Sequence, residues 1–476
     1  MLEIIGRTDE KKLLDKILNS DEAELVAVYG RRRVGKTYLI RNGFEKQLVF
    51  EFSGIHHATL NQQLESFGTA LTRAARALPV ATPLNWVRAF QVLADFLSPL
   101  LKRQRKVIFF DELPWINTPK SGFLPAFENF WNTWASLQRN LIVVVCGSAA
   151  AWMIQKVIKN KGGLHNRVSR KIRLLPFTLA ETEAFLKARK VNLDQYQILQ
   201  LYMAMGGIPQ YLKQVEPGES AAQAIDRTCF TKDGLLHDEF KNLYDSLFDH
   251  AGNHIDVIRA LAQKGAGLSR GEIIEACNLT SGGRTTQILE ELTESGFINS
   301  YVPFNRKAKD SIYKLIDEYS LFYIKFIENS RSIGAGSWIK FSTSSSWKSW
   351  SGYAFESICM KHILQMKKAL GVENVYTEVS VWRYKPRKNE QGAQIDLLID
   401  RQDLCINVCE MKFSTSAFEI TKAYAQELQM KQQVFQGRSQ TRKTLFLTMV
   451  STYGVKNRNS YPGLVQSEVK LADLFI

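Results

Sequence analysis

The sequence predicts an α/β protein of several domains, and three observations support this fold class. The chain has 476 residues, more than one hydrophobic core usually organises, so three or four domains are expected. Its composition is 45% hydrophobic and 23% charged, which is typical of a folded globular protein. Short apolar runs such as ELVAVY, residues 24–29, are followed by helix-like segments, as in a parallel sheet covered by helices.

Composition and charge narrow the function classes. No apolar run is long enough to span a bilayer and the first residues do not resemble a signal peptide, so we expect a cytoplasmic protein without a membrane partner. The six cysteines are scattered, which is typical of reduced thiols. The net charge of +15 favours nucleic acid or nucleotide phosphates as partners, although a basic, well-solvated surface would give the same value.

A phosphate-binding loop is predicted directly after the strand at 24–29. The segment GRRRVGKT has the pattern G-x-x-x-x-G-K-[ST], and a helix-like run follows it, as this pattern requires. The glycines let backbone N–H groups curl around phosphate oxygens, and the helix N-terminus attracts negative charge. We expect Lys36 to reach the β- and γ-phosphates of ATP and Thr37 to bind Mg²⁺. The residues predicted to hold the nucleotide are Gly30, Arg31, Arg32, Arg33, Val34, Gly35, Lys36, Thr37 and Tyr38.

Two further apolar strands end in polar residues that such a loop needs. The first, within 105–111, ends in Asp111, which is expected to hold Mg²⁺, and is followed by Glu112, which is expected to orient or deprotonate the attacking water. The second ends at Ser148, which either lies beside the γ-phosphate or caps the next helix, and both roles are compatible.

A run of lysines and arginines without acidic residues lies between Lys156 and Arg173. Arg167 or Arg170 is expected to stabilise transition-state charge, in cis or from a neighbouring subunit of a homo-oligomer. We assign this role to Arg167. A nucleic-acid contact is the alternative for both arginines.

In order along the chain, IIGRTDEKKLL, VYGRRRVGKTYLI, VIFFDELPW, VVVCGS, LLPFTLAE and MGGIPQYL resemble the archaeal-type ATPase family of the AAA+/STAND group. The match is dense over roughly the first half of the chain. The resemblance implies a P-loop ATPase core over residues 1–175, with Gly6 and Arg7 near the adenine. It also implies a helical lid over 176–250, whose Gly-Gly-Ile-Pro turn lies near the nucleotide. By itself, this turn indicates only a break between helices.

The pattern over 251–335 predicts a winged-helix domain: helix, helix, turn, helix and a hairpin. Ser269 and Glu272 form a predicted capping box. The residues expected to face a DNA groove are Arg284, Thr285, Thr286 and Gln287, and those expected at the wing tip are Arg306, Lys307 and Lys309. Because the third helix also carries acidic residues, a protein-interaction or lid module is an equal alternative.

Residues 336–476 predict an α/β domain with a carboxylate cluster. After an expected connector over 344–352 comes a helix with Glu356. A hairpin centred near residue 403 would place Asp396 opposite Glu410, and Lys412 shares the strand face of Glu410. Another helix is expected over 416–435.

This order resembles the PD-(D/E)xK nuclease superfamily, with Ile395-Asp396 in place of Pro-Asp. The resemblance implies that Glu356, Asp396 and Glu410 bind Mg²⁺ or Mn²⁺ and that Lys412 positions or deprotonates water. The alternative is a β-sheet core with an incidental ion pair between Glu410 and Lys412.

Two functions follow from these observations. The first is an ATP-binding and ATP-hydrolysing protein that acts on DNA through a metal-dependent nuclease-like tail. The second is an ATP-dependent signalling or scaffold switch, in which the winged helix and the tail bind partners without cutting.

Overall fold

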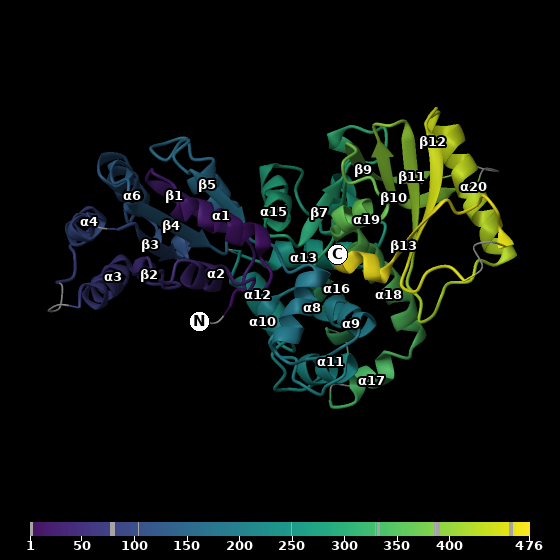
Figure 1. Ribbon diagram of the computed structural model, residues 1–476, viewed down its shortest axis with the longest axis horizontal. Coiled ribbons are helices and arrows are strands. Elements are labelled where there is room, and N and C mark those ends of the chain that lie inside the picture. Colours follow the sequence, from purple (N-terminus) through teal and green to yellow (C-terminus); the bar gives the residue numbers. More distant parts are fainter. Residues whose placement is uncertain are drawn as a thin grey trace. The chain divides into compact units, whose positions relative to one another are not determined.

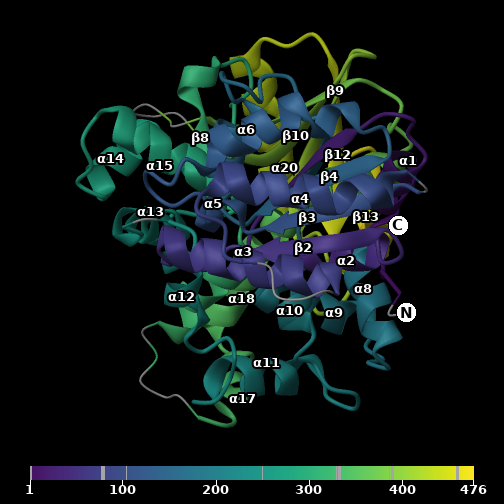
Figure 2. The ribbon, with the colours of Figure 1, turned by 90° about the vertical axis from the view of Figure 1, so that its left-hand side faces the viewer.

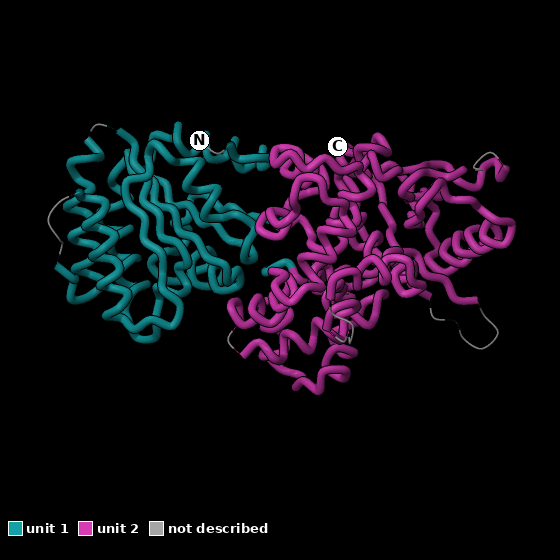
Figure 3. The backbone as a smooth tube through the Cα atoms, turned by 90° about the horizontal axis from the view of Figure 1, so that it is seen from below, with its two compact units in different colours: residues 1–176, 294–296 teal, residues 177–293, 297–476 magenta. Residues whose placement is uncertain are grey.

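The computed structural model describes residues 3–76, 81–102, 104–248, 250–328, 330, 334–384, 386, 391–456 and 460–476. The chain forms two compact units (Figure 3): residues 1–176 with 294–296, and residues 177–293 with 297–476. The first division falls one residue after the predicted end of the ATPase core. The predicted boundaries at 250 and 335 lie inside the second unit and stay predictions.

The first unit is built around a sheet of five parallel strands in the order β2-β3-β4-β1-β5. The strands are β1 (Glu24–Tyr29), β2 (Leu48–Ser53), β3 (Lys106–Asp111), β4 (Leu141–Gly147) and β5 (Arg170–Arg173). The helices are α1 (Thr8–Leu18), α2 (Lys36–Gly43), α3 (Leu60–Ala75), α4 (Trp86–Leu101), α5 (Leu113–Ile116), α6 (Phe123–Thr133) and α7 (Ala150–Met153). An α/β unit with a central parallel sheet was expected, and the structure has it.

Hydrophobic residues cover both faces of this sheet, as a parallel sheet requires. On one face, α3, α4 and α6 form a layer over alternate residues of the strands (Figures 1 and 2). Phe67 and Phe90 of this layer pack against Phe50 and Phe110 of the strands, with ring centroids 5.3 Å apart for Phe50 and Phe67 and 6.0 Å apart for Phe90 and Phe110. This rigid sheet positions the loops at the carboxyl ends of its strands.

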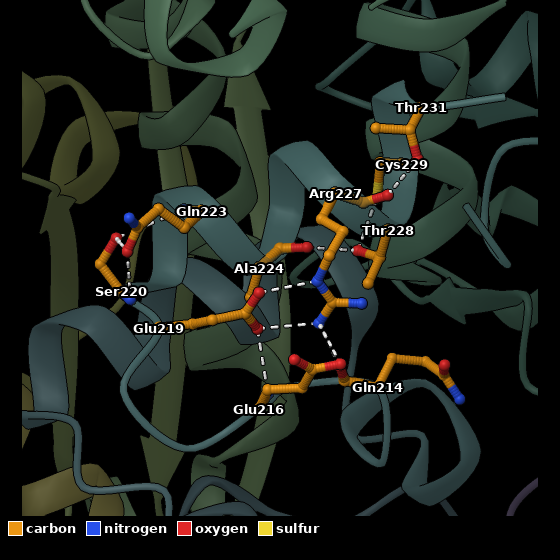
Figure 4. Close-up of polar contacts among 10 residues, drawn as sticks. All are labelled: Gln214, Glu216, Glu219, Ser220, Gln223, Ala224, Arg227, Thr228, Cys229 and Thr231. Atoms are coloured by element: carbon orange, nitrogen blue, oxygen red, sulfur yellow. Dashed lines mark hydrogen bonds and ion pairs between the residues drawn. The ribbon is translucent and has the colours of Figure 1, made fainter. Parts of the chain in front are cut away.

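The second unit begins with a helical segment. Its helices are α8 (Leu179–Ala188), α9 (Gln195–Met205), α10 (Pro209–Leu212), α11 (Ala221–Phe230) and α12 (Glu239–Asp245). Figure 4 shows how Arg227 of α11 fastens the preceding loop: it donates two hydrogen bonds to the Glu219 carboxylate, at 2.7 and 2.8 Å, and one to the Gln214 carbonyl at 2.5 Å. The hydrogen bonds from Arg227 lower the pKa of Glu219.

The Gly-Gly-Ile-Pro sequence forms the predicted turn between two helices. Gly206 has a φ of 63° and ends α9, and α10 starts at Pro209. A Cβ on Gly207 would lie 2.0 Å from the Phe177 carbonyl oxygen, so only glycine fits this position. Because the P-loop belongs to the other unit, the expected proximity of this turn to the nucleotide stays a prediction.

The middle of the second unit has the predicted element order. Helices α13 (Gly252–Ala262), α14 (Arg270–Ala276) and α15 (Gly283–Glu294) accompany a small antiparallel sheet in the order β6-β8-β7, formed by β6 (Leu268–Ser269), β7 (Ile298–Tyr301) and β8 (Ile312–Leu315). The capping box of Ser269 and Glu272 at the start of α14 is confirmed. The assignment of these elements as a winged-helix domain stays a prediction.

The C-terminal part contains a mixed five-stranded sheet in the order β13-β12-β11-β10-β9. Strands β9 to β11 form an antiparallel meander, and β11, β12 and β13 are parallel. The strands are β9 (Thr377–Tyr384), β10 (Ala393–Arg401), β11 (Cys405–Lys412), β12 (Thr444–Ser451) and β13 (Ser467–Lys470). The helices after β8 are α16 (Glu318–Phe322), α17 (Ser337–Phe341), α18 (Ser345–Lys361), α19 (Ile363–Ala369) and α20 (Lys422–Ser439).

One element was predicted wrongly. Residues 344–352 do not connect domains but form the start of α18, where Ser344 accepts a hydrogen bond from the Trp347 backbone N–H at 3.2 Å. Trp347 and Trp350 are buried in an aromatic cluster, with the Trp347 ring 5.0 Å from that of Trp338. Burial of these indoles outweighs the weak helix propensity of the serines.

Candidate functional site

The carboxyl ends of β1, β3 and β4 bring the predicted ATP-site residues of the first unit together. Because β4 lies between β1 and β3, the residue that follows it stands between the P-loop and the acidic pair. Gly30 leaves β1 with a φ of 146°, and a Cβ there would lie 2.2 Å from the Leu174 carbonyl oxygen. Glycine is therefore required where the loop passes the end of β5.

Lys36 is held at the start of α2 by oxygen atoms. Its Nζ donates hydrogen bonds to the carbonyl oxygens of Gly30 and Arg31, at 3.0 and 2.9 Å, and to Ser148 Oγ at 3.0 Å. The side chain is buried, at 5% exposure, and no carboxylate is among these three acceptors. Its positive charge is therefore available to phosphate oxygens, which carry the negative charge that this loop is built to bind.

Ser148 connects Lys36 with the predicted catalytic glutamate. Ser148 Oγ donates to Glu112 Oε1 at 2.5 Å, and the Ser148 backbone N–H donates to Glu112 Oε2 at 3.0 Å. Glu112 follows β3 in a left-handed conformation, with a φ of 47°, which turns its side chain toward β4. One hydroxyl group therefore links the Lys36 ammonium to the Glu112 carboxylate.

Thr37 and Asp111 form the pair that suits Mg²⁺. Thr37 Oγ1 donates to Asp111 Oδ2 at 2.7 Å, although the two residues are far apart in sequence. Hydroxyl and carboxylate oxygens are hard donors of the kind that Mg²⁺ binds, usually together with water and substrate phosphates. The donor set of these residues fits the cation that the sequence implies.

The N-terminal segment contacts the P-loop. Arg7 is buried and donates from Nη2 to the Val34 carbonyl oxygen at 3.1 Å, and Tyr38 donates to the Glu3 carbonyl at 3.4 Å. Gly6, with a φ of 65°, permits the bend before α1. This arrangement places Arg7 and Tyr38 beside the loop. The expected position of Gly6 and Arg7 near the adenine stays a prediction.

Trp115 is a residue that the sequence did not single out. The Arg32 guanidinium lies 5.9 Å from the centroid of its ring, and the His56 ring lies 4.8 Å from it. Trp115 belongs to α5, which directly follows Glu112. The sequence feature that could have identified Trp115 was an aromatic residue within a few positions of the acidic pair Asp111-Glu112.

The structure restricts the role of Arg167. Arg167 is exposed and precedes β5, and the next residues pair with the start of β1: Ser169 N donates to Leu25 O at 2.9 Å. The P-loop begins about five residues farther along this strand, or about 16 Å away. Arg170 forms an ion pair with Glu24 at the same edge of the sheet, at 3.6 Å. Neither arginine reaches the loop around Lys36 in cis, so a role from a neighbouring subunit and a nucleic-acid contact are the two alternatives that stay predictions.

In the tail, the register of β10 and β11 is the predicted one. Leu397 pairs with Cys409 and Asp400 with Ile406, so positions symmetric about 403 face each other and Asp396 lies opposite Glu410. The helix predicted over 416–435 is α20, which begins and ends later. Two of its residues that contact Glu410 were not predicted from the sequence. Tyr424 and Lys431 lie two helical turns apart on the face of α20 toward β11, a spacing that was visible in the sequence.

Glu410 is enclosed by donors. Its carboxylate accepts hydrogen bonds from Tyr424 Oη at 2.9 Å and from Lys431 Nζ at 3.0 and 3.1 Å, and Lys412 Nζ lies 3.1 Å from Oε1. Although burial raises the pKa of Glu410, the two lysines outweigh it and the pKa is lowered. The carboxylate is therefore ionised and its charge is neutralised within the protein.

The other two carboxylates are crowded by their own surroundings. Burial and the Asp396 charge raise the pKa of Glu356 to about 8, against the opposing effect of Lys314. Burial and Glu410 raise the pKa of Asp396, against the lysines. Among the described residues, no group of three or more histidine, cysteine, aspartate or glutamate side chains has a geometry that could hold a metal ion. The expected metal site of Glu356, Asp396 and Glu410 is not among such groups and stays a prediction.

The third helix of the middle segment presents only part of the predicted DNA-reading set. Thr285 is buried, at 1% exposure, and donates to the Thr280 carbonyl at 2.7 Å, so its expected position facing a groove is wrong. Gln287 donates to Glu291 at 2.7 Å. Arg284 is exposed, as are the three basic residues of the β7–β8 loop, Arg306, Lys307 and Lys309.

Over the described ranges, the structure contains no helix that combines the length and the apolar character needed to cross a bilayer.

Comparison with known proteins identifies the first unit together with the start of the second. Residues 5–215 match the family described as ATPase domain predominantly from Archaea. An uncharacterised protein of Methanocaldococcus jannaschii is 22% identical over 397 residues, 83% of either chain. An ATP-binding protein of the same organism is 40% identical over 45 residues, 10% of this chain and 76% of its own. The Walker-type ATPase of Pyrococcus abyssi is 17% identical with a TM-score of 0.51, over 67% of this chain and 96% of that structure, which shows a shared fold.

Proposed function

Because residues 5–215 form an archaeal-type ATPase domain, we propose that the chain uses ATP hydrolysis in the first unit to control DNA binding by the second. The observation that carries the proposal is the hydrogen-bonded path from Lys36 through Ser148 to Glu112. Lys36 binds the phosphates, Thr37 and Asp111 hold Mg²⁺, and Glu112 accepts a proton from the attacking water or orients it. Mg²⁺, when bound, neutralises charge that develops on the phosphates.

Three exposed basic residues of the β7–β8 loop support DNA as the partner. Arg306, Lys307 and Lys309 are exposed in one loop, and the whole chain carries a net charge of +15. Lysines and arginines that neutralise phosphates release counterions, so affinity for DNA falls as salt rises.

The test combines both units. Fluorescence anisotropy with a labelled duplex is measured without nucleotide, with ADP and with a slowly hydrolysed ATP analogue. We expect nucleotide-dependent DNA affinity that disappears in Lys36→Ala and persists in Lys46→Ala, a change at an exposed lysine just after the end of α2. Replacing Arg306, Lys307 and Lys309 by alanine lowers the slope of log affinity against log salt by about 2 to 3. DNA affinity that is indifferent to nucleotide would contradict the proposal.

A nuclease-like tail is the second part of the proposal. The strand order of the mixed sheet, the helix before it and the helix between β11 and β12 accompany Asp396, Glu410 and Lys412 as the resemblance implies. Incubation with plasmid and linear DNA in Mg²⁺ or Mn²⁺, with Asp396→Ala as the control, tests for cutting. Absence of cutting with an intact ATPase would leave the switch that binds partners without cutting.

The position of Arg167 adds a homo-oligomer to the proposal. Since Arg167 is exposed at the amino-terminal edge of the sheet, we propose that it completes the ATP site of a neighbouring copy. Mixing Arg167→Ala protein with Lys36→Ala protein should then restore part of the ATPase activity, because one kind of interface combines both intact residues. No recovery in a confirmed mixed oligomer would contradict it.

A further inference from the structure

Lys314 is a buried lysine in a part of the chain that was expected to bind DNA. It lies on β8 opposite Asn299 of β7 and is only 7% exposed. Lysine is almost never buried this far unless its charge is matched. Its match must therefore come from the elements packed against the inner face of β8.

The carboxylate cluster of the tail supplies this match. Lys314 and Glu356 of α18 line one small cavity together with Tyr301 and Tyr353. The electrostatic effects of Glu356 and Asp396 both favour the charged lysine, whereas burial lowers the pKa of Lys314. The lysine Nζ also lies 6.0 Å from the centroid of the Tyr301 ring, whose face attracts a cation.

The cavity that Lys314 shares with Glu356 is too small for a hydrated metal ion. The cavity has a volume of about 10 Å³, which is close to the least that holds one water molecule. Mg²⁺ demands near-octahedral oxygen coordination and usually keeps several of its waters. Glu410 is unavailable as well, because Lys412 and Lys431 already contact its carboxylate. Glu410 thus contacts two lysines, and Glu356 shares its cavity with Lys314.

Contacts between β7, the loop after it and the tail hold β8 in place. The Phe304 backbone N–H donates to the Val381 carbonyl of β9 at 3.0 Å, and the Phe304 ring lies 5.3 Å from that of Phe435 in α20. β8 itself pairs with β7 over four residues. Lys314 can leave the cluster only if this part of the sheet separates from the tail.

We propose that Lys314 is the resident cation of the carboxylate cluster, and that it excludes a divalent metal ion as long as β8 stays packed on the tail. The site then has two states. With β8 in place it is neutral and structural. With Lys314 withdrawn, Glu356 and Asp396 lose the positive charge beside them, and a divalent cation of the Mg²⁺ or Mn²⁺ class can take its place.

Manganese binding to the full, nucleotide-free chain tests the proposal. Bound Mn²⁺ is counted by electron paramagnetic resonance in the unaltered protein, in Asp396→Asn and in Lys314→Met. Methionine is a matched choice, because it keeps much of the length of lysine and removes the charge. We expect the unaltered protein and Asp396→Asn to bind the same amount of Mn²⁺. Lys314→Met should gain one site, with affinity increased about tenfold or more, because a buried positive charge has been removed.

Two further variants assign the gained site to the carboxylate cluster and to the lost charge. The gained site must be absent from the double variant Lys314→Met with Asp396→Asn, and Lys314→Arg should bind no more Mn²⁺ than the unaltered chain. A tail site in the unaltered protein that Asp396→Asn removes overturns the proposal, and this comparison does not require a Lys314 variant to fold. A folded Lys314→Met protein without an added site also overturns it. The readout is metal binding, so failure here is distinguishable from the absence of DNA cutting.

Discussion

Two groups of carboxylates in this chain contain similar residues but differ in the donors that contact them. At the ATP site, Asp111 and Glu112 accept hydrogen bonds from the hydroxyls of Thr37 and Ser148. In the tail, Glu410 contacts the ammonium groups of Lys412 and Lys431. Hydroxyl donors orient a carboxylate and leave its charge in place, whereas lysines cancel it.

The carboxylates of the proposed ATP site contact hydroxyl groups, whereas Glu410 in the tail is already paired with two lysine ammonium groups. The contacts of Asp111 and Glu112 described above are with hydroxyl groups, so the proposed binding of Mg²⁺ there would not displace a lysine. A metal ion at the tail must compete with lysines, which a sequence motif does not reveal. Substitutions at either site can break or sharpen this contrast.

The largest expected effect is at Glu112. Glu112→Gln keeps an acceptor for Ser148 but removes the base, so we expect ATP turnover to fall by about 10² to 10⁴-fold. Nucleotide affinity should change little, since Lys36 and Thr37 are untouched. Phosphate release and nucleotide titration measure the two quantities, with the exposed Glu45→Gln as the control. Turnover within a few-fold of the unaltered protein would exclude Glu112 as the base.

The next effect concerns the tail. Glu410→Gln leaves Lys412 and Lys431 without their buried counter-charge, so we expect the second unit to lose about 2 to 3 kcal/mol of stability. ATP turnover at saturating ATP serves as the internal control, because the ATP site lies in the other unit. Urea unfolding followed by tryptophan fluorescence measures the loss, compared with the exposed Glu373→Gln. Equal midpoints for both variants would mean that the ion pairs contribute nothing.

Protonation should weaken the second unit through His362. Its Nε2 accepts a hydrogen bond from the Leu179 N–H at 3.1 Å and its Nδ1 contacts the Ile358 carbonyl at 2.8 Å, so the buried ring is neutral. Burial lowers its pKa from 6.5 to about 4. The unfolded chain therefore binds the proton first, and stability falls as the pH drops from about 6.5 toward 4.

This pH effect has a definite size. Between about pH 7 and pH 5 the loss due to His362 should be about 2 kcal/mol, measured as the difference in pH slope between the unaltered protein and His362→Gln, because the raised pKa of Glu356 acts in the opposite direction. The comparison of both proteins by urea unfolding at the two pH values checks it. The same pH slope in both would contradict the assignment to His362.

The smallest expected effect is at Ser148. Ser148→Ala removes the hydroxyl between Lys36 and Glu112, and we expect ATP turnover to fall about tenfold, since one hydrogen bond to charged groups is lost on either side. Ser148→Thr keeps the hydroxyl and should retain most of the activity. If both variants behave alike, the path from Lys36 to Glu112 is structural only.

Much of the ATP site was predictable because its chemistry is local. The P-loop, its glycines and the helix start at Lys36 are contiguous, and an acidic pair at the end of an apolar strand needs only the strand direction to be placed. The hairpin that sets Asp396 against Glu410 was also predictable, since a turn centre fixes an antiparallel register.

Other features depended on packing between distant segments. Thr285 points inward because it is buried and donates a hydrogen bond to the Thr280 carbonyl oxygen. Residues 344–352 are helical because Trp347 and Trp350 are buried. The position of Arg167 followed from the order of strands in the sheet, which the sequence does not state.

The sequence alone thus predicted which residues bind nucleotide and determined which strand positions of the tail hairpin pair, because both depend on spacing along one or two neighbouring strands. Only the tertiary structure decided what neutralises the carboxylates of the tail. Lys314 comes from β8, Glu356 from α18 and Asp396 from β10, and their charges interact through the folded second unit. Electrostatic energy depends on distance in space and on burial, and neither can be read from distance along the chain.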